Sequence, residues 1–377
     1  YPLRPMNALG QLGPLEAARC LLSYGREFAR TPPENNDFEQ WITHRFGRRL
    51  FRHFFKSYTE KLWGLPSHEL DADFAAQRIK GFSLSAALRD ALLGGGGGRH
   101  KTLVDQFAYP TGGTGSIYDR MAEALQARGG QLHLQTPVNQ VVTANNHVTG
   151  LRVAGADATL PYDHVISSMP LNHLLRNLPG LPEEAHEAAG QLRFRNTILV
   201  YLKVEQPEVF PVQWLYIHSP ELRVGRITNF RNWVPELHRG QPQSILALEF
   251  WCNFEDALWE EPDAELIGRA RRELAATGLA QESLVSEGHV HRIPRCYPVY
   301  FRGYHATLAP IIRHLRGIGG LEVIGRYGAY KYNNQDHSIL RAAENVLRGG
   351  GHDTWGINTD YEYQEASRIT ATGLVQD

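Results

Sequence analysis

The strongest constraint on how this chain folds is a run of alternating strand patterns between residues 193 and 254. Four stretches there alternate apolar with polar side chains, and they read TILVYLKV, QWLYIHS, RVGRITNF and SILALEFW. A period of two is typical of strands that bury one face and leave the other accessible. Because the stretches are contiguous along the chain, they predict an antiparallel sheet with aromatic residues on one face.

Helical spacing dominates the chain before this sheet, and helices and strands mix on both sides of it. The expected helices cover residues 15–27, 38–55, 83–93, 116–128, 264–276 and 338–347. The further expected strands cover residues 131–134, 138–143, 148–153, 164–168, 289–294 and 321–325, with a turn at Asn145-Asn146. The glycine run 94–98 reads as a flexible connector. This arrangement predicts a multi-lobed fold that is α/β in part and α+β in part.

Composition narrows the class of partner. The 377 residues are enough for two or three lobes, and the net charge of -1 gives no electrostatic reason to expect nucleic acid or an anionic membrane. No apolar run approaches the roughly 20 residues that cross a bilayer. Cys20, Cys252 and Cys296 are odd in number and lack metal or redox spacing, which favours a reducing cytoplasm. The histidines show no ligand spacing either, so we predict no metal and a small-molecule partner.

The segment from Ile324 to Ser338 has the pattern of a binding turn. It reads as a strand, a glycine-bearing turn and the start of a helix. Gly325 and Gly328 allow a backbone to approach a ligand closely, and a helix after Asp336 would direct its first N–H groups at the turn. The alternative is a plain strand-to-helix connection in which Asp336 or Ser338 caps the helix. Spacing alone leaves both interpretations open.

This segment resembles the C-terminal FAD-contacting motif of UDP-galactopyranose mutases and of bacterial protoporphyrinogen-oxidase-like oxidoreductases, which belong to the FAD-dependent amine oxidase superfamily. The shared signature is a Gly-Arg-x-Gly turn, an aromatic-basic-Tyr step and then Asn-Gln-Asp-His-Ser. Further stretches resemble the same proteins in the same order, at residues 46–49, 54–64, 76–81, 109–115, 167–170, 214–216, 226–233, 295–298 and 355–365. The resemblance therefore extends along the whole chain.

The resemblance implies an FAD-binding Rossmann-like domain with a helical lobe and an antiparallel-sheet substrate domain. The segments that it implies are a mainly helical substrate lobe (1–100), part of the FAD-binding domain (101–175), the antiparallel-sheet substrate domain (176–300) and a return to the FAD-binding domain (301–377). The family opens with a strand–GxGxxG–helix unit, and no such turn occurs in this sequence. We therefore expect an N-terminally truncated chain in which FAD affinity is in question.

The resemblance also assigns site residues. Those expected to contact the cofactor are Val138, Ser168, Met169, Gly325, Arg326, Asn334, Gln335, Asp336 and Ser338. Those expected to contact the substrate are Tyr58, Trp63, Arg78, Arg226, Trp233, Tyr297 and Tyr332. No side chain is assigned the chemical step, because the flavin carries it.

Chemistry gives each group of residues a role and an alternative. Arg78 and Arg226 match positions where the mutases carry diphosphate-contacting arginines, whose forked donors suit that group, although a lone arginine more often forms a surface salt bridge. The aromatic side chains offer stacking faces and hydroxyl donors, or they pack in the core. Asn334 and Gln335 lie beside the flavin rim or cap a helix, and His337 is a proton shuttle or a structural histidine.

The function that follows is an FAD-dependent enzyme resembling UDP-galactopyranose mutase, acting on a nucleotide sugar in surface-polysaccharide metabolism, with NAD(P)H as a candidate reductant. One alternative is an FAD-dependent oxidoreductase of the amine-oxidase or protoporphyrinogen-oxidase kind on another substrate. Another is a cofactor-free binding remnant in the truncated form. No sequence feature shows a general base that would separate mutase from oxidase chemistry.

Overall fold

The computed structural model describes residues 12–31, 37–73, 109–156, 158–335, 338–339 and 355, and the backbone of two strands between residues 367 and 376. The chain forms two compact units. Unit 1 consists of Tyr1–Asp119, Asn196–Pro294 and Glu362–Asp377, and unit 2 consists of Arg120–Arg195 and Arg295–Tyr361. The four segments predicted from the sequence stay a prediction.

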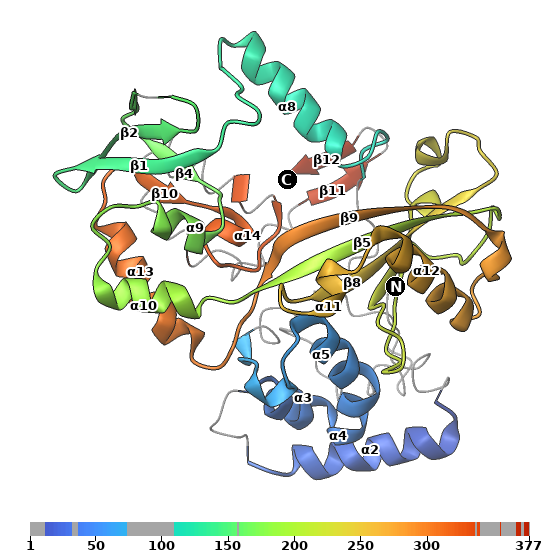
Figure 1. Cartoon of the computed structure of the whole chain (residues 1–377). Helices are drawn as coiled ribbons and strands as arrows, with labels where there is room; N and C mark the ends of the chain where they lie inside the picture. Colours follow the sequence, from blue (N-terminus) through green and yellow to red (C-terminus); the bar gives the residue numbers. More distant parts are fainter. Residues whose placement is uncertain are drawn as a thin grey trace. The chain divides into compact units, whose positions relative to one another are not determined.

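Unit 1 is built on the predicted antiparallel sheet (Figure 1). Its five strands are β5 (Phe194–Val204), β6 (Trp214–Tyr216), β7 (Arg226–Asn229), β8 (Ser244–Cys252) and β9 (Val285–Pro298). They lie in the order β6-β7-β8-β5-β9. The pairs β6–β7, β7–β8 and β5–β8 are antiparallel, so the four alternating stretches of the sequence are confirmed as neighbouring strands.

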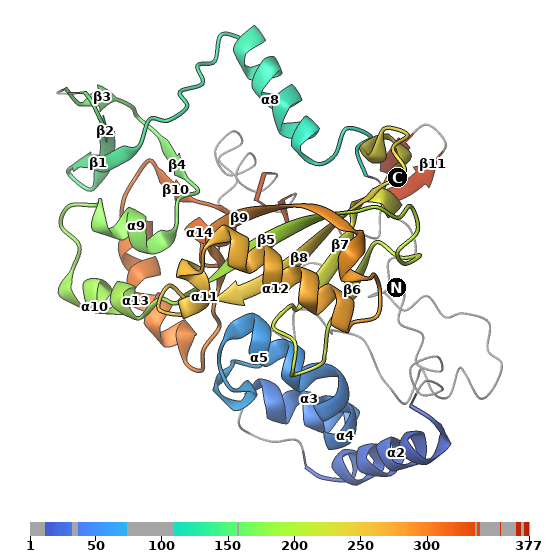
Figure 2. The same cartoon turned by 45° about the vertical axis from the view of Figure 1, so that its right-hand side comes forward.

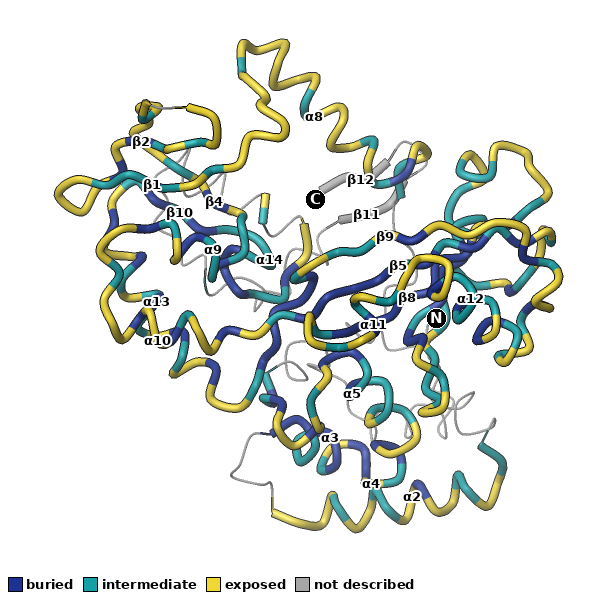
Figure 3. Tube along the Cα trace, in the orientation of Figure 1, coloured by how far each residue is buried: buried dark blue, intermediate teal, exposed yellow. Residues whose placement is uncertain are grey.

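The two faces of this sheet differ in chemistry because side chains alternate along each strand. One face carries the main apolar core, in which Leu248 and Phe250 of β8 meet Leu266 and Leu274 of helix α12 (Asp263–Ala276). Figures 1 and 2 both show α12 lying along the sheet, and Figure 3 shows buried residues along β5 and β8. Each such fully buried side chain contributes about 1.5–3 kcal/mol. The other face carries Arg226 and its neighbours, described below.

The helical part of unit 1 begins with α2 (Pro14–Phe28), which confirms the helix expected at 15–27. The helical pattern expected over 38–55 is confirmed, but Gly47 interrupts it. The structure has α3 (Phe38–Phe46), α4 (Arg48–Leu50), a π-helix η1 (Phe51–Lys56), α5 (Ser57–Trp63) and a short 3-10 turn η2 (Ser67–Glu69). Gly47 ends α3 with φ of 84°, and a Cβ there would lie 2.6 Å from the Tyr24 backbone nitrogen. The chain breaks at Gly47 because α2 passes too close for a side chain.

Unit 2 contains a small antiparallel sheet of β1 (Val138–Ala144), β2 (His147–Val153) and β3 (Leu160–Pro161). The predicted turn between β1 and β2 is confirmed, since Asn145 and Asn146 both have positive φ, at 51° and 57°. The strand expected at 131–134 is wrong: residues 131–137 form no strand, and Leu132 and Leu134 are 44% and 75% exposed. Their alternation faces no core, so it forms no sheet.

A second sheet in unit 2 pairs β4 (Val165–Ser167) with β10 (Leu321–Val323) in parallel. The helices of this unit are α9 (Leu171–Arg176), α10 (Glu183–Gln191), α13 (Tyr304–Arg316) and the short α14 (Gly325–Gly328). The sequence analysis did not anticipate α9, α10 or α13. Helix α13 contains Pro310, a residue that disfavours helix interiors, and it packs against α10.

The remaining elements complete the list. They are α8 (Gly115–Ala127), α11 (Ala257–Glu260), the 3-10 turns η3 (Phe230–Asn232), η4 (Pro235–His238) and η5 (Glu282–Leu284), and the antiparallel pair β11 (Ser367–Thr370) and β12 (Gly373–Gln376). Helix α8 confirms the helix expected at 116–128, and none of its residues is buried (Figure 3). The helix expected at 83–93 and residues 340–347 of the helix expected at 338–347 lie outside the described residues. Among the described helices, none has the length and apolar character needed to cross a membrane.

Candidate functional site

Arg226 and Glu249 form an ion pair on the face of the unit 1 sheet that lies opposite the core. They are direct partners in the register of β7 and β8. The Arg226 Nε donates to Glu249 Oε1 at 2.6 Å, and Nη2 of the same guanidinium lies 2.5 Å from that oxygen. Glu249 is only 5% exposed. Burial raises the pKa of its carboxyl, and the adjacent Arg226 charge partly opposes this.

Aromatic side chains surround this ion pair on the same face. Tyr58 of α5 lies 4.9 Å from Tyr216, the register partner of Arg226, and 5.6 Å from Trp251, measured between ring centroids. Trp214, two residues before Tyr216 on β6, stacks on Trp233 at 5.7 Å. We call this set the aromatic face, and it consists of Tyr58, Trp214, Tyr216, Arg226, Trp233, Glu249 and Trp251. Flat rings around a guanidinium suit a ligand with an aromatic base and an anionic group.

A lysine fixes the loop that leads into Arg226. The Lys61 Nζ donates to the backbone oxygens of Ile217, Ser219 and Val224, at 3.0, 2.6 and 3.2 Å. Burial lowers its pKa to about 8, although Glu273 acts in the opposite direction. The sequence analysis missed this residue, because no local pattern links a helix lysine to carbonyls more than 150 positions away.

Four of the seven predicted substrate residues are not on the aromatic face in the described structure: Trp63, Arg78, Tyr297 and Tyr332, of which the two tyrosines belong to unit 2. Trp63 is only 2% exposed, so its position favours core packing in the helical part of unit 1. Arg78 lies outside the described residues. Tyr58, Arg226 and Trp233 are brought together on the aromatic face, so three of the predicted substrate residues share one surface.

In unit 2, parallel pairing brings the predicted cofactor segments together. Ser167 at the end of β4 pairs with Val323 at the end of β10, and the Ile324 N–H donates to the Ser167 backbone oxygen at 3.0 Å. Ser168, Met169 and Gly325 therefore all leave the sheet at one edge. In open sheets, ligands bind outside the carboxyl ends of parallel strands.

The glycines of the turn after β10 permit this close arrangement. Gly325 has φ of 83°, which favours glycine, and a Cβ there would lie 3.9 Å from Ser338 Oγ and 4.0 Å from Ser168 Cβ. A Cβ on Gly328 would lie 2.9 Å from the Ser167 backbone oxygen, which is too close for an ordinary side chain. The predicted residues Ser168, Gly325 and Ser338 thus lie within a few ångströms of one another.

Arg326 lies over two stacked tyrosines that were predicted as substrate residues. The rings of Tyr297 and Tyr332 are 5.6 Å apart, and the Arg326 guanidinium carbon lies 5.2 Å and 4.4 Å from their centroids. Its Nε and Nη2 also donate to the Asn333 backbone oxygen, at 3.3 and 3.0 Å. Tyr330 is buried, and its hydroxyl lies 2.8 Å from the backbone oxygens of Arg193 and Val299, which anchors the segment. Arg326 therefore orients the turn through cation–π contacts.

Two buried polar atoms near this turn have no hydrogen-bond partner among the described residues, and they fit an FAD molecule. They are the Ser167 Oγ and the Asn333 Oδ1, and both residues are buried. Buried polar atoms are normally paired, so each suits a polar group of a ligand. The sequence analysis missed Asn333 and chose Asn334 and Gln335, which the structure leaves exposed. Asp336 and His337 lie outside the described residues.

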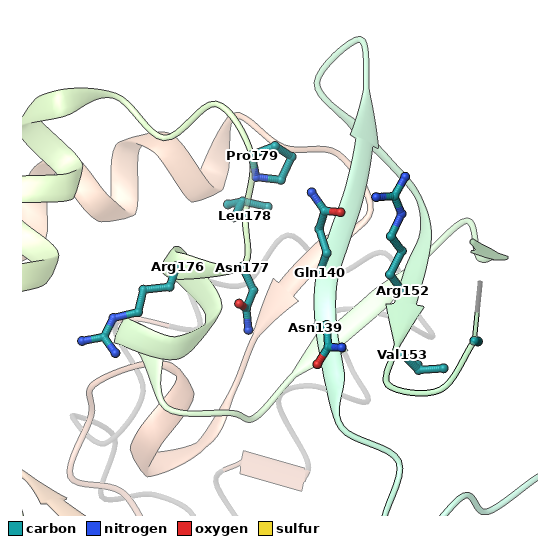
Figure 4. A pocket seen from close by; sticks show the side chains of 9 residues that line it. Asn139, Gln140, Arg152, Val153, Arg176, Asn177, Leu178 and Pro179 are labelled. Carbon is teal, nitrogen blue, oxygen red and sulfur yellow. The ribbon is translucent and has the colours of Figure 1, made fainter. Parts of the chain in front are cut away.

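Val138, the remaining predicted cofactor residue, begins β1 next to a cavity of about 400 Å³ in unit 2. The cavity is lined by Asn139, Gln140, Arg152, Val153, Ala156, Arg176, Asn177, Leu178 and Pro179. Figure 4 shows the Arg152 and Arg176 guanidinium groups far from one another and pointing in different directions. They do not converge on one point, so the cavity lacks the arrangement that holds an anion.

Glu16, Cys20 and His53 gather potential metal-ligand atoms within 4.8 Å of one another in unit 1. The Glu16 carboxylate is already held there. Arg49 donates to both of its oxygens at 2.7 Å, and His53 Nε2 lies 2.9 Å from one of them. These contacts lower the pKa of Glu16 to about 2. The cluster is therefore best described as an ion-pair network that ties α2 to α4 and η1.

Comparison with known proteins places this geometry in context. The sequence profile of the flavin-containing amine oxidoreductase family matches residues 7–327. A solved structure of reduced UDP-galactopyranose mutase matches with a TM-score of 0.76 and 22% identity, over 93% of this chain and 75% of that chain. A protein of Exiguobacterium sp. 255-15 assigned as a protoporphyrinogen oxidase matches with a TM-score of 0.63 and 16% identity, over 83% of this chain and 67% of that chain.

A mutant of putrescine oxidase also matches, with a TM-score of 0.57 and 16% identity, over 93% of this chain and 77% of that chain. These proteins carry different activities on one architecture, so the likeness establishes the fold and leaves the reaction to the site. The mixed α/β fold with antiparallel sheets is the part of the predicted fold that is confirmed.

Proposed function

This chain belongs to the flavin-containing amine oxidoreductases, a family of flavoenzymes, and we propose that it binds FAD and acts on a nucleotide sugar as UDP-galactopyranose mutase does. The observation that carries the substrate class is Arg226 among the rings of the aromatic face. A guanidinium is the donor that matches a diphosphate, and flat rings match a base and a sugar. The likeness to the mutase at a TM-score of 0.76 supports the same assignment.

The cofactor is supported by unit 2. Ser167 and Asn333 would offer their unpartnered polar atoms to FAD, and the turn at Gly325 would let its backbone approach. Arg326, held by Tyr297 and Tyr332, would keep that turn in place. Bound flavin would supply the electron-accepting and nucleophilic chemistry that the protein side chains lack.

Titration with UDP tests the substrate class. UDP should quench the fluorescence of Trp214 and Trp233, and Arg226→Ala should weaken binding by at least tenfold, since a charge-assisted contact is worth about 1.5–3 kcal/mol. Arg269→Ala is the matched control, because Arg269 also forms an ion pair with a glutamate, Glu261, but lies on helix α12, away from the aromatic face. Absent binding, or binding that Arg226→Ala leaves unchanged, would refute the proposal.

Flavin binding is tested separately by a pair of neighbouring asparagines. Asn333→Ala should weaken FAD binding in an absorbance titration, because it removes the buried Oδ1, which has no hydrogen-bond partner among the described residues. Asn334→Ala should leave the affinity unchanged, because Asn334 is exposed. Equal effects of the two substitutions would contradict the assignment of Asn333. A chain purified without flavin absorbance, and unable to take up FAD, would favour the cofactor-free alternative.

A second candidate is an FAD-dependent oxidoreductase on another substrate, favoured by the family profile over residues 7–327. It predicts substrate-dependent bleaching of oxidised flavin and production of hydrogen peroxide without prior reduction. A reaction that is redox-neutral and needs reduced flavin would exclude this candidate and favour the mutase assignment.

A further inference from the structure

Glu249 occupies a place where a carboxylate is stable only with a partner. Its neighbours Leu248 and Phe250 point into the apolar core, and Glu249 itself is 5% exposed on the opposite face. Both Arg226 donors converge on one carboxylate oxygen, Oε1. Arg226 is more accessible than its partner, with 31% of its side chain exposed against 6% for Glu249. The pair therefore has a buried anion and a cation that reaches toward solvent.

Within the described residues, the charged and titratable groups near the pair come from β5, α5, β6 and the loop after it, η3 and β9. Tyr201 of β5 lies close enough for the Glu249 charge to raise the pKa of its hydroxyl, after the larger effect of burial. From α5 come Tyr58 and Lys61, and Lys61 donates to backbone oxygens of the loop 217–224. Tyr216 on β6 and His218 after β6 also lie near the pair. Arg231 in η3 donates to the backbone oxygens of Gln241 and Gln243. His289 on β9 lies on the far side of Tyr201.

Among the described residues, this distribution leaves Arg226 as the counter-charge in contact with the Glu249 carboxylate. Lys61 and Arg231 are directed at backbone oxygens, and the guanidinium in contact with the carboxylate belongs to Arg226. An anionic ligand on the aromatic face would compete with Glu249 for that guanidinium. A buried carboxylate that loses its counter-charge becomes neutral by taking up a proton, because the charged form is poorly solvated there.

We propose that a phosphate-bearing ligand binds the aromatic face by taking Arg226 from Glu249, and that Glu249 takes up one proton from solvent as it does so. This inference rests on the proposed function, since it assumes that a nucleoside diphosphate binds at Arg226. The only covalent bond made is that of the solvent proton to Glu249, which removes one negative charge from the protein, and Arg226 then serves as counter-charge to the ligand phosphate. Ligand affinity then depends on pH through a residue that never touches the ligand.

Linkage gives the direction of this dependence. Where binding takes up a proton, affinity falls as pH rises, by up to about tenfold per pH unit between the pKa values of the free and the bound states. UDP alone does not produce this trend above pH 7, since its terminal phosphate ionises near pH 6. Proton uptake at pH 7–8 therefore reports on the protein.

Calorimetry of the full chain with UDP tests the inference. At pH 7.5 in two buffers of different ionisation enthalpy, the difference in observed heat gives the protons taken up, and we expect a value approaching one. Uridine should give no uptake, because it lacks phosphate, and pyrophosphate should give the same uptake as UDP if the anion alone displaces Glu249. Glu249→Gln should abolish the uptake and tighten UDP binding at pH 8. Glu273→Gln is the matched control, since Glu273 is another buried carboxyl of unit 1 that bonds the Val224 N–H rather than Arg226.

The outcomes separate the two proposals. UDP binding to the wild-type chain without buffer-dependent heat would overturn proton uptake and leave the nucleotide-sugar assignment intact. Uptake that persists in Glu249→Gln, or disappears in Glu273→Gln, would show that another group takes the proton. No UDP binding at all would overturn the proposed function and this inference with it. The buffer comparison on the wild-type chain holds even if a variant fails to fold.

Discussion

Gly225 offers a sharp test of how the aromatic face is packed. It lies next to Arg226, and its backbone N–H donates to the backbone oxygen of Glu249 at 2.9 Å. A Cβ at this position would lie 1.8 Å from Cζ3, 2.5 Å from Cη2 and 2.6 Å from Cε3 of the Trp251 ring. Carbon atoms in contact are normally about 3.5–4 Å apart, so the ring would have to move by roughly 2 Å.

The Trp251 ring has little room for such a movement. It is buried, and its edge packs against Tyr58 at 87° between ring planes. Overpacking of this kind typically lowers the free energy of unfolding by about 1–3 kcal/mol, and the size of the overlap places Gly225→Ala at the upper end. We expect UDP binding to weaken as well, since the displaced ring adjoins Arg226.

Chemical denaturation measures this effect, with a control of opposite sign. Gly268→Ala, in the middle of α12, should raise the free energy of unfolding by up to about 1 kcal/mol, because alanine favours a helix. Apart from the backbone of its own helix, the one described atom within 4 Å of its Cβ would be Nη1 at the flexible end of the Arg272 side chain, at 3.3 Å. In a Trp251→Leu background most of the cost of Gly225→Ala should disappear. A cost that is equal in both backgrounds, or below about 0.5 kcal/mol, would refute the reasoning.

Three further expectations concern stability. Tyr330→Phe should lower the free energy of unfolding by about 1–3 kcal/mol, because it leaves buried backbone groups without their hydroxyl partner. Tyr118→Phe on the exposed helix α8 should have no effect, and denaturant titration compares the two variants. Because the pKa of Lys61 is lowered to about 8, the unfolded chain binds more protons than the folded chain above that pH. The stability of wild type relative to Lys61→Met should therefore rise from pH 8 toward pH 10, and a difference that does not change with pH would contradict this. The pKa of Glu16, lowered from 4.5 to about 2, gives stability that is complete above pH 4.5 and is lost as pH falls toward 2, so the advantage of wild type over Arg49→Met should shrink over that range in acid unfolding.

The sequence predicted those parts of the fold that depend on local pattern. Period-two alternation located β5 and β8, and the Asn145-Asn146 pair located the β1–β2 turn, because positive φ suits asparagine. It failed where tertiary contact overrode the pattern. The helix expected over 38–55 breaks at Gly47 because α2 passes there, and the strand expected at 131–134 has no partner.

The candidate sites divide in the same way. Resemblance to known flavoenzymes pointed to Arg226 and to the turn at Gly325, and the family assignment is confirmed by the profile match. It did not distinguish Asn333 from Asn334, because their side-chain burial depends on how the segment folds back onto β4. Trp63 is likewise a residue type suited to stacking on a ligand, yet the packing of α5 buries it.

The sequence by itself located the strands of the unit 1 sheet, the β1–β2 turn and the family, since each depends on residues that are neighbours in the chain. Only the tertiary structure decided that Arg226 faces Glu249, that Lys61 bonds the loop before β7, and that Ser167 lies beside the turn after β10. These partners are distant in sequence and meet through strand order and register. A one-residue change of register would turn every side chain of a strand to the other face, which is why the pairing, rather than the pattern, sets the chemistry of the site.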